Sequence, residues 1–140
     1  MTADDIITAA RGCLGTPFRH QGRVAGEALD CAGLAVQVAR ACGCAVVDAE
    51  AYGPYPARGQ LETALAAQPG LQRLPAGAVP QPGDLLLMRF AREPQHLAIL
   101  AGETIIHAWT EAGKCCEHDF TAAWQRRVCA VYRFVEVGGE

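Results

Sequence analysis

The sequence has 140 residues, a formal net charge of −3 at pH 7, and 51% hydrophobic against 19% charged residues. This length and composition indicate one globular domain with one core, so we predict a single domain over residues 1–140. The acidic balance argues against a non-specific nucleic-acid binder. The sequence also lacks the run of about 18 apolar residues that membrane insertion requires.

The N-terminus, Met1 to Asp5, is acidic where a secretory signal peptide would be basic. We therefore expect synthesis in the cytoplasm without a signal peptide, in a reducing environment where the seven cysteines form no disulfide framework. Cys42-x-Cys44, and Cys115-Cys116 with His118, lack the spaced pairs typical of zinc sites. We expect no metal and no cofactor.

Hydrophobic periodicity and turn residues predict most elements of the chain. In chain order we expect a helix over 2–14, a polar loop over 18–23, a helix from Cys31 to Gly43, a short helix over 58–68, a strand over 85–90, hairpin strands over 96–100 and 104–109, a short helix over 119–127 capped by Asp119, and a strand over 128–135. Thr2 and Asp5 form the capping box expected for the first helix. The rest of 45–82, including 52–56 and 75–82, is expected to be loop and a wall of a substrate cleft.

Cys31 lies at the predicted start of a helix. Asp30 precedes it as the expected N-cap, which places the thiol at the positive end of the helix dipole. Such a position stabilises the thiolate, which is the nucleophilic form. Taken alone, however, a free cysteine is more often a small buried core residue.

Two histidines of the predicted hairpin lie on one face. If Gly102 and Glu103 form a two-residue turn, Ala98 lies opposite His107. His96 shares the face of Ala98, because side chains alternate along a strand. His96 and His107 are then diagonal neighbours, roughly 7–8 Å apart at Cβ and within reach of a hydrogen bond between their rings.

These three side chains make a plausible catalytic set. Cys31 supplies a thiol, His96 a general base, and His107 an acceptor that orients the base. Either histidine alone is more often a partly buried structural side chain whose hydrogen bonds are satisfied. Their combination with a cysteine at a helix start favours nucleophilic catalysis.

Four motifs resemble those of one family, the NlpC/P60 cysteine peptidases. Residues 30–34, Asp-Cys-Ala-Gly-Leu, resemble its Asp-Cys-(Ser/Ala)-Gly-Leu signature. Residues 82–86 resemble its Pro-Gly-Asp-Leu segment, 96–100 its His-Val-Gly-Ile strand, and 106–108 the segment that carries its third catalytic residue. The motifs occur in the order of the family and lie within residues 12 to 109.

The resemblance implies a papain-like α+β fold, with N-terminal helices packed on a central antiparallel β-sheet. It implies a cysteine peptidase that cuts an amide bond of the peptidoglycan stem peptide, often the bond between D-γ-glutamyl and diaminopimelate. Cys31 would be the nucleophile and an oxyanion donor through its backbone N–H, His96 the base and His107 the third member. Further substrate-binding or oxyanion residues would be Phe18, His20, Gln21 and Asp30.

Residues 15–23, Gly-Thr-Pro-Phe-Arg-His-Gln-Gly-Arg, resemble one branch of short peptidases encoded with phage tail genes, including those of gene transfer agents. That branch implies a tail-tip or baseplate component, with tail hub proteins as partners, that acts in the host periplasm during DNA delivery. Many family members carry Tyr where this chain has Phe18, which lacks the hydroxyl. His20 or Gln21 would then replace that donor, or the site works without it.

Two other functions remain open from the sequence. One is a structural or adaptor protein of the tail tip that keeps the fold without turnover. The other is a thiol amidase or acyltransferase with a different substrate on the same scaffold. A low pKa of Cys31 would favour an enzyme, and a normal or high pKa would favour the adaptor.

Overall fold

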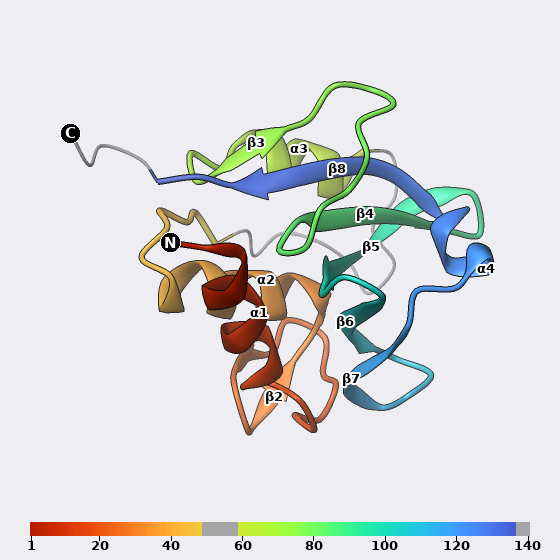
Figure 1. Ribbon diagram of the computed structural model, residues 1–140. Helices are drawn as coiled ribbons and strands as arrows, with labels where there is room; N and C mark the ends of the chain where they lie inside the picture. Colours follow the sequence, from red (N-terminus) through yellow and green to blue (C-terminus); the bar gives the residue numbers. More distant parts are fainter. Residues whose placement is uncertain (49–58, 137–140) are drawn as a thin grey trace.

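The structure is a computed structural model that describes residues 1–48 and 59–136. It contains α1 (Ala3–Arg11), β1 (Arg23–Val24), β2 (Ala28–Leu29), α2 (Cys31–Ala41), α3 (Gln60–Ala66), β3 (Leu71–Arg73), β4 (Leu85–Phe90), β5 (Glu93–Leu100), β6 (Thr104–Trp109), β7 (Lys114–Asp119), α4 (Ala122–Gln125) and β8 (Val128–Phe134) (Figure 1). Within the described residues no helix has the length and apolarity needed to cross a membrane.

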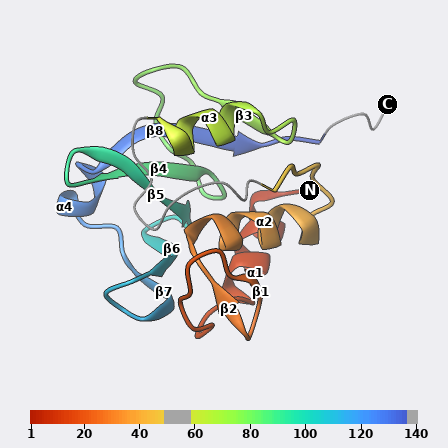
Figure 2. The same ribbon diagram turned by 180° about the vertical axis from the view of Figure 1, so that it is seen from behind.

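Six strands form one antiparallel sheet in the order β3-β8-β4-β5-β6-β7, and β1 and β2 form a separate small hairpin. Figures 1 and 2 show α1 and α2 lying together beside this sheet, with α3 next to β3. The predicted α+β class, with N-terminal helices packed on a central antiparallel sheet, is therefore confirmed.

Both faces of the sheet are buried at Leu85 to Met88 of β4, which explains the continuous apolar run there. Leu85 and Leu87 belong to the core that the helices cover, together with Leu34 of α2. Leu86 and Met88 point to the opposite face, where a second cluster includes Trp124 of α4. A strand buried on both faces needs apolar side chains at every position.

The structure confirms most of the predicted elements. The Thr2 capping box is present, and the bounds of β4 and β6 match the prediction. Gly43 adopts a positive φ of 74° after α2, as expected. The short helix expected over 58–68 is α3, whereas the loop expected over 52–56 lies outside the described residues.

The prediction for residues 110–127 was wrong in part. Asp119 ends strand β7 and caps no helix, because α4 begins only at Ala122 with Thr121 as its N-cap. β7 has the sequence Lys-Cys-Cys-Glu-His-Asp, whose polar residues do not indicate a strand, yet it pairs with β6 along its whole length as the edge of the sheet. β1, β2 and β3 are two or three residues long and were also missed.

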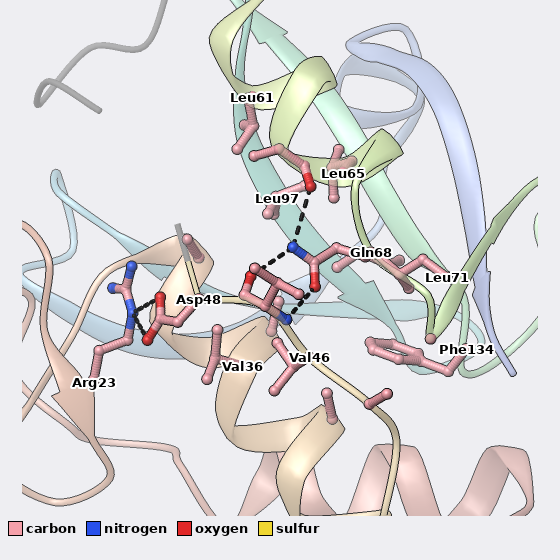
Figure 3. A pocket seen from close by; sticks show the side chains of 18 of the residues that line it. Arg23, Val36, Val46, Asp48, Leu61, Leu65, Gln68, Leu71, Leu97 and Phe134 are labelled. Atoms are coloured by element: carbon pink, nitrogen blue, oxygen red, sulfur yellow. Dashed lines mark hydrogen bonds and ion pairs between the residues drawn. The ribbon is translucent and has the colours of Figure 1, made fainter. Parts of the chain in front are cut away.

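A small apolar cavity of about 100 Å³ lies between α2, α3 and the sheet (Figure 3). Val36, Leu61 and Leu97 are among its lining residues. At its rim the amide of Gln68 accepts from the backbone N–H of Val47 at 2.8 Å and donates to the carbonyl of Val47 at 2.6 Å. The segment that follows α2 is thereby fastened to the end of α3.

Candidate active site

Asp30 fixes the position at which α2 begins. Its buried carboxylate accepts from the backbone N–H of Gly33 at 2.7 Å, so the predicted N-cap is confirmed. The same carboxylate accepts from the backbone N–H of Gln21 at 2.8 Å and pairs with the Arg23 guanidinium at 2.9 Å. One side chain therefore joins the 18–23 loop to the helix that carries Cys31.

Two glycines allow this loop to lie directly on the helix. A Cβ added at Gly33 would lie 2.0 Å from the carbonyl oxygen of Gly22, which is a severe steric clash. A Cβ at Gly22 would in turn meet the backbone of Ala28 at 2.6 Å. The glycines of the Asp-Cys-Ala-Gly-Leu and His-Gln-Gly-Arg segments thus touch each other in the fold, which gives both a steric reason.

Cys31 lies at the start of α2, and its side chain packs against the core. Burial, followed by the negative charge of Asp30, raises the pKa of Cys31 to about 12. The backbone N–H groups of Leu97 and Ala32 act in the opposite direction, because they stabilise the anion, but they do not outweigh burial. The expectation of a thiolate stabilised by the helix start was wrong for this state, in which Cys31 is a neutral thiol.

The two predicted histidines meet in the structure. The observed pairs Ile99–Ile106 and Leu100–Ile105 have the register that a turn at Gly102 and Glu103 requires. His96 Nε2 lies 2.5 Å from His107 Nδ1, a short hydrogen bond between buried rings. The predicted diagonal relation of the two histidines is confirmed.

The sheet opens at the place where these rings lie. The ladder between β5 and β6 comprises the pairs at Ile99 and Leu100, whereas β5 begins at Glu93 and β6 extends to Trp109. The N-terminal half of β5 is thus separate from β6, and the Leu97 amide there acts on the Cys31 sulfur. The N-terminal end of α2 lies beside β5 and β6 (Figures 1 and 2).

The Cys31 sulfur lies near the backbone of Leu97, the residue that follows His96. Among the hydrogen bonds of the described residues, none joins the Cys31 sulfur to His96. Catalytic hydrogen bonds are often long in the absence of substrate and shorten in its complex. Proton transfer between the two groups therefore requires Cys31 and His96 to come within hydrogen-bond distance.

Burial keeps both histidines neutral. It lowers the pKa of His96 well below its usual value, with a further contribution from the charge of His107, and it lowers the pKa of His107 to about 3, with a further contribution from His118. A neutral imidazole can accept a proton, so His96 is in the form that a general base requires.

Aromatic rings hold the histidines in place. Phe90 stacks on His96 at a centroid distance of 4.7 Å, and Trp109 stacks on His107 at 5.3 Å. Trp124 of α4 packs edge-on against His107 at 5.1 Å. Three large side chains thus restrict the rotation of both rings.

A third histidine, which the prediction assigned no role, lies behind His107. His118 Nε2 is 2.7 Å from His107 Nε2, and His118 Nδ1 is 3.0 Å from the backbone carbonyl oxygen of Asp119. The cross-strand pairing of His107 with Cys116 puts His118 at the diagonal position on the same face. Recognition of β7 as a strand would have been needed to find this residue from the sequence.

His107, Cys116 and His118 are the group of described residues that could hold a metal ion, since their ligand atoms lie within 4.8 Å of one another. Two nitrogens bound to one tetrahedral zinc lie about 3.3 Å apart, given Zn–N distances of about 2.0–2.1 Å. The two Nε2 atoms here are 2.7 Å apart, the distance of a hydrogen bond. The geometry therefore fits a shared proton better than a metal.

The residues expected to bind substrate lie in the loop that Asp30 holds. Phe18 is half-buried and packs against the core, and its backbone N–H donates to the carbonyl of Gly113 at 2.9 Å. His20 and Gln21 are exposed at the turn, and Gln21 has a positive φ of 62°. Their part in substrate binding remains a prediction.

The family model of the NlpC/P60 family matches residues 15–133, which is most of the chain and includes Cys31, His96 and His107. The chain belongs to the NlpC/P60 family. The comparison with curated proteins gave no match.

Solved structures of NlpC/P60 proteins share the fold. One is an NlpC/P60 family protein from Bacillus cereus, 19% identical with a TM-score of 0.69 over 96% of this chain and 40% of that chain. The peptidoglycan hydrolase RipB from Mycobacterium tuberculosis is 17% identical, with a TM-score of 0.64 over 96% and 65%. The NlpC/P60 domain of the peptidoglycan hydrolase SagA is 20% identical, with a TM-score of 0.61 over 94% and 97%.

This chain thus spans about two fifths of the Bacillus cereus protein and most of the isolated SagA domain. At these identities the likeness establishes the fold. The activity and the substrate of this NlpC/P60 protein depend on its own residues.

The close approach of two glycines predicts the effect of Gly33→Ala. The new Cβ would overlap the Gly22 carbonyl, so we expect a loss of at least about 3 kcal/mol in the free energy of unfolding, measured by urea denaturation. Gly77→Ala is the control, since Gly77 has a positive φ of 84° and open space around it, and should cost only about 1 kcal/mol. Equal losses in the two variants would contradict the steric account.

The lowered pKa of His107 predicts acid sensitivity of the fold. Below pH 6.5 the unfolded chain binds a proton at this residue and the folded chain does not, until the pH approaches about 3. Stability should therefore fall as pH falls, by up to about 1.4 kcal/mol per pH unit for each such histidine. His107→Asn should show a shallower fall between pH 7 and 5 than the wild type in urea denaturation, and parallel curves would contradict the assignment.

Proposed function

We propose that this protein is a cysteine endopeptidase that hydrolyses an amide bond of the peptidoglycan stem peptide. The observation that carries the proposal is the hydrogen-bonded pair of neutral histidines at the gap in the sheet, beside the cysteine at the start of α2. A buried imidazole pair next to a thiol suits base-assisted nucleophilic attack. Membership of the NlpC/P60 family, and the names of the peptidoglycan hydrolases RipB and SagA that share the fold, support this substrate class.

In the proposed reaction, His96 takes the proton from the Cys31 thiol as the sulfur attacks the carbonyl carbon. Backbone N–H groups at the start of α2, including that of Cys31, stabilise the oxyanion. His96 then gives the proton to the leaving amine, which leaves a thioester on Cys31. A water molecule, deprotonated by His96, hydrolyses the thioester and restores the thiol.

The raised pKa of Cys31 changes one step of the expected mechanism. The position of Cys31 at a helix start predicted a thiolate before substrate arrives. Burial instead favours the neutral thiol and neutral imidazole, so the proton is transferred during the attack. His96, and not the helix start alone, then supplies the driving force for thiolate formation.

We further propose that the bond cut is the one between D-γ-glutamyl and diaminopimelate. The setting we propose is a phage-like tail tip or baseplate that carries the protein into the host periplasm, where tail hub proteins are its partners. Support for the setting comes from residues 15–23, which resemble the tail-encoded branch. In the fold this segment contains the loop that Asp30 ties to the start of α2.

One observation favours the alternative of a non-catalytic adaptor with the same fold. A thiol whose pKa is about 12 is the state expected of an inert buried cysteine. An adaptor, however, has no need of two buried histidines joined at 2.5 Å, whose desolvation costs stability at low pH. An assay of the wild type and Cys31→Ala on stem peptides separates the two functions.

Replacement of Cys31 tests the proposed reaction. With purified stem peptides as substrate and mass spectrometry of the products, Cys31→Ala should lower the turnover rate by at least about 1,000-fold. Cys42→Ala is the matched control, because Cys42 is also half-buried beside the core but lies at the other end of α2. Turnover by Cys31→Ala at the wild-type rate would overturn the proposal, and no turnover by the wild type would favour the adaptor.

Two substitutions of His107 test its orienting role. His107→Asn keeps an oxygen that can accept from His96 Nε2, whereas His107→Leu keeps a similar volume without an acceptor. We expect the Asn variant to retain more activity than the Leu variant, and both to retain more than Cys31→Ala. Equal rates for Asn and Leu, with both variants folded by circular dichroism, would contradict an orienting hydrogen bond.

The neutral state of His96 predicts the pH profile. Because burial lowers the pKa of this base, kcat/KM should stay level between pH 8 and pH 6.5 and should fall only below pH 6.5. Circular dichroism at each pH separates loss of activity from acid unfolding. An acid limb centred above pH 6.5 would contradict the assignment of His96 as a neutral base.

A further inference from the structure

His118 extends the histidine pair into a line of three rings. Hydrogen bonds run from His96 Nε2 to His107 Nδ1, from His107 Nε2 to His118 Nε2, and from His118 Nδ1 to the carbonyl oxygen of Asp119, at 2.5, 2.7 and 3.0 Å. His96 and His107 are buried, and His118 is half-buried at the outer end. The line begins at the gap beside Cys31 and ends on the backbone of β7.

The carbonyl oxygen at the end gives this line a direction. It carries no proton and can only accept, so Nδ1 of a neutral His118 is the protonated nitrogen and Nε2 is bare. Bare Nε2 accepts from His107, whose proton is therefore on Nε2 and whose Nδ1 is bare. His107 Nδ1 accepts in turn from His96 Nε2. Among the hydrogen bonds of the described residues, this leaves Nδ1 of His96 as the ring nitrogen that can take a proton.

Without His118, the His96–His107 pair alone would not fix which ring donates the hydrogen bond and which accepts it. A carboxylate as third member can only accept, so it fixes the tautomer of the base. His107 can either accept or donate at Nδ1, and the opposite choice would put a proton on Nδ1 of His96. The outer hydrogen bond of His118 removes that ambiguity.

We propose that His118 is a positioning residue, which through His107 holds His96 in the tautomer whose Nδ1 can deprotonate Cys31. The role in catalysis rests on the proposed peptidase function, whereas the tautomer itself does not. His118 acts through His107 and has no contact with the reacting atoms.

The surroundings support a hydrogen-bonded role for His118. Trp124 lies against its ring at 4.9 Å, so the ring has an apolar neighbour on that side. Glu117, its neighbour in β7, is bonded to Arg11 at 2.9 Å and to Thr104 at 2.6 Å and is thus engaged elsewhere. Arg127 lies over Phe90 and Trp124, and its charge contributes to the lowered pKa of His96.

Nitrogen NMR reads the tautomer directly and needs no activity. The protein is labelled with ¹⁵N at histidine in the Cys31→Ala background, with a chelator present, and long-range ¹H–¹⁵N spectra show which ring nitrogen of His96 carries the proton. We expect Nε2 to carry it. His118→Gln, whose amide can accept from His107 and donate to Asp119, should keep the proton on Nε2.

His118→Lys reverses the direction, since an ammonium group can only donate. In this variant the proton of His96 should move to Nδ1. A proton on Nδ1 of His96 with His118 intact would overturn the proposal, as would an unchanged tautomer in a folded His118→Lys protein. If His118→Lys does not fold, the intact protein and His118→Gln still decide the question.

Enzyme activity, measured in proteins that retain Cys31, provides the second test. His118→Gln should keep kcat within about threefold of the wild type, and His118→Lys should lower kcat by at least about 100-fold with KM unchanged. Ala123→Lys is the control for added charge, because Ala123 is exposed next to Trp124 and outside the line of rings. An active His118→Lys enzyme would refute the positioning role alone, whereas an inactive wild type with the expected tautomer would refute the peptidase alone.

Discussion

The start of α2 has to be fastened at one place against the sheet, because the thiol and the histidines come from different layers of the fold. The Asp30 carboxylate meets this constraint, since it accepts from the backbone of Gly33 and Gln21 and pairs with Arg23. The close packing of Gly22 against Gly33 also holds the 18–23 loop against α2. The use of the histidines as a base for the thiol depends on the resulting position of Cys31 beside β5 and β6.

The gap explains how residues from opposite layers can act together. Leu97 faces the helices, so His96 projects toward the other face, which Trp124 and its neighbours cover. Where β6 separates from β5, the Leu97 amide acts on the Cys31 sulfur. The same burial that makes the histidines neutral bases also raises the pKa of the thiol, and this combination favours proton transfer during attack over a preformed ion pair.

The sequence was most informative where short-range rules apply. The cap at Asp30, the turn at Gly102 and Glu103, and the diagonal relation of His96 and His107 all follow from local periodicity and were confirmed. It was least informative where long-range pairing decides. β7 reads as a polar segment and becomes a strand only because β6 offers an edge, so the place of His118 behind His107 could not be seen. The pKa of Cys31 was also misjudged, because helix position can be read from sequence and the depth of burial cannot.

The central claim is that the sulfur of Cys31 becomes covalently attached to the substrate with His96 as its base. The most direct measurement is rapid acid quenching of the wild-type protein with stem peptide, followed by intact mass and peptide mapping. The account predicts a transient acyl adduct on Cys31, formed before the second product is released. Product formation with no adduct on Cys31, or with an adduct on another cysteine, would contradict it.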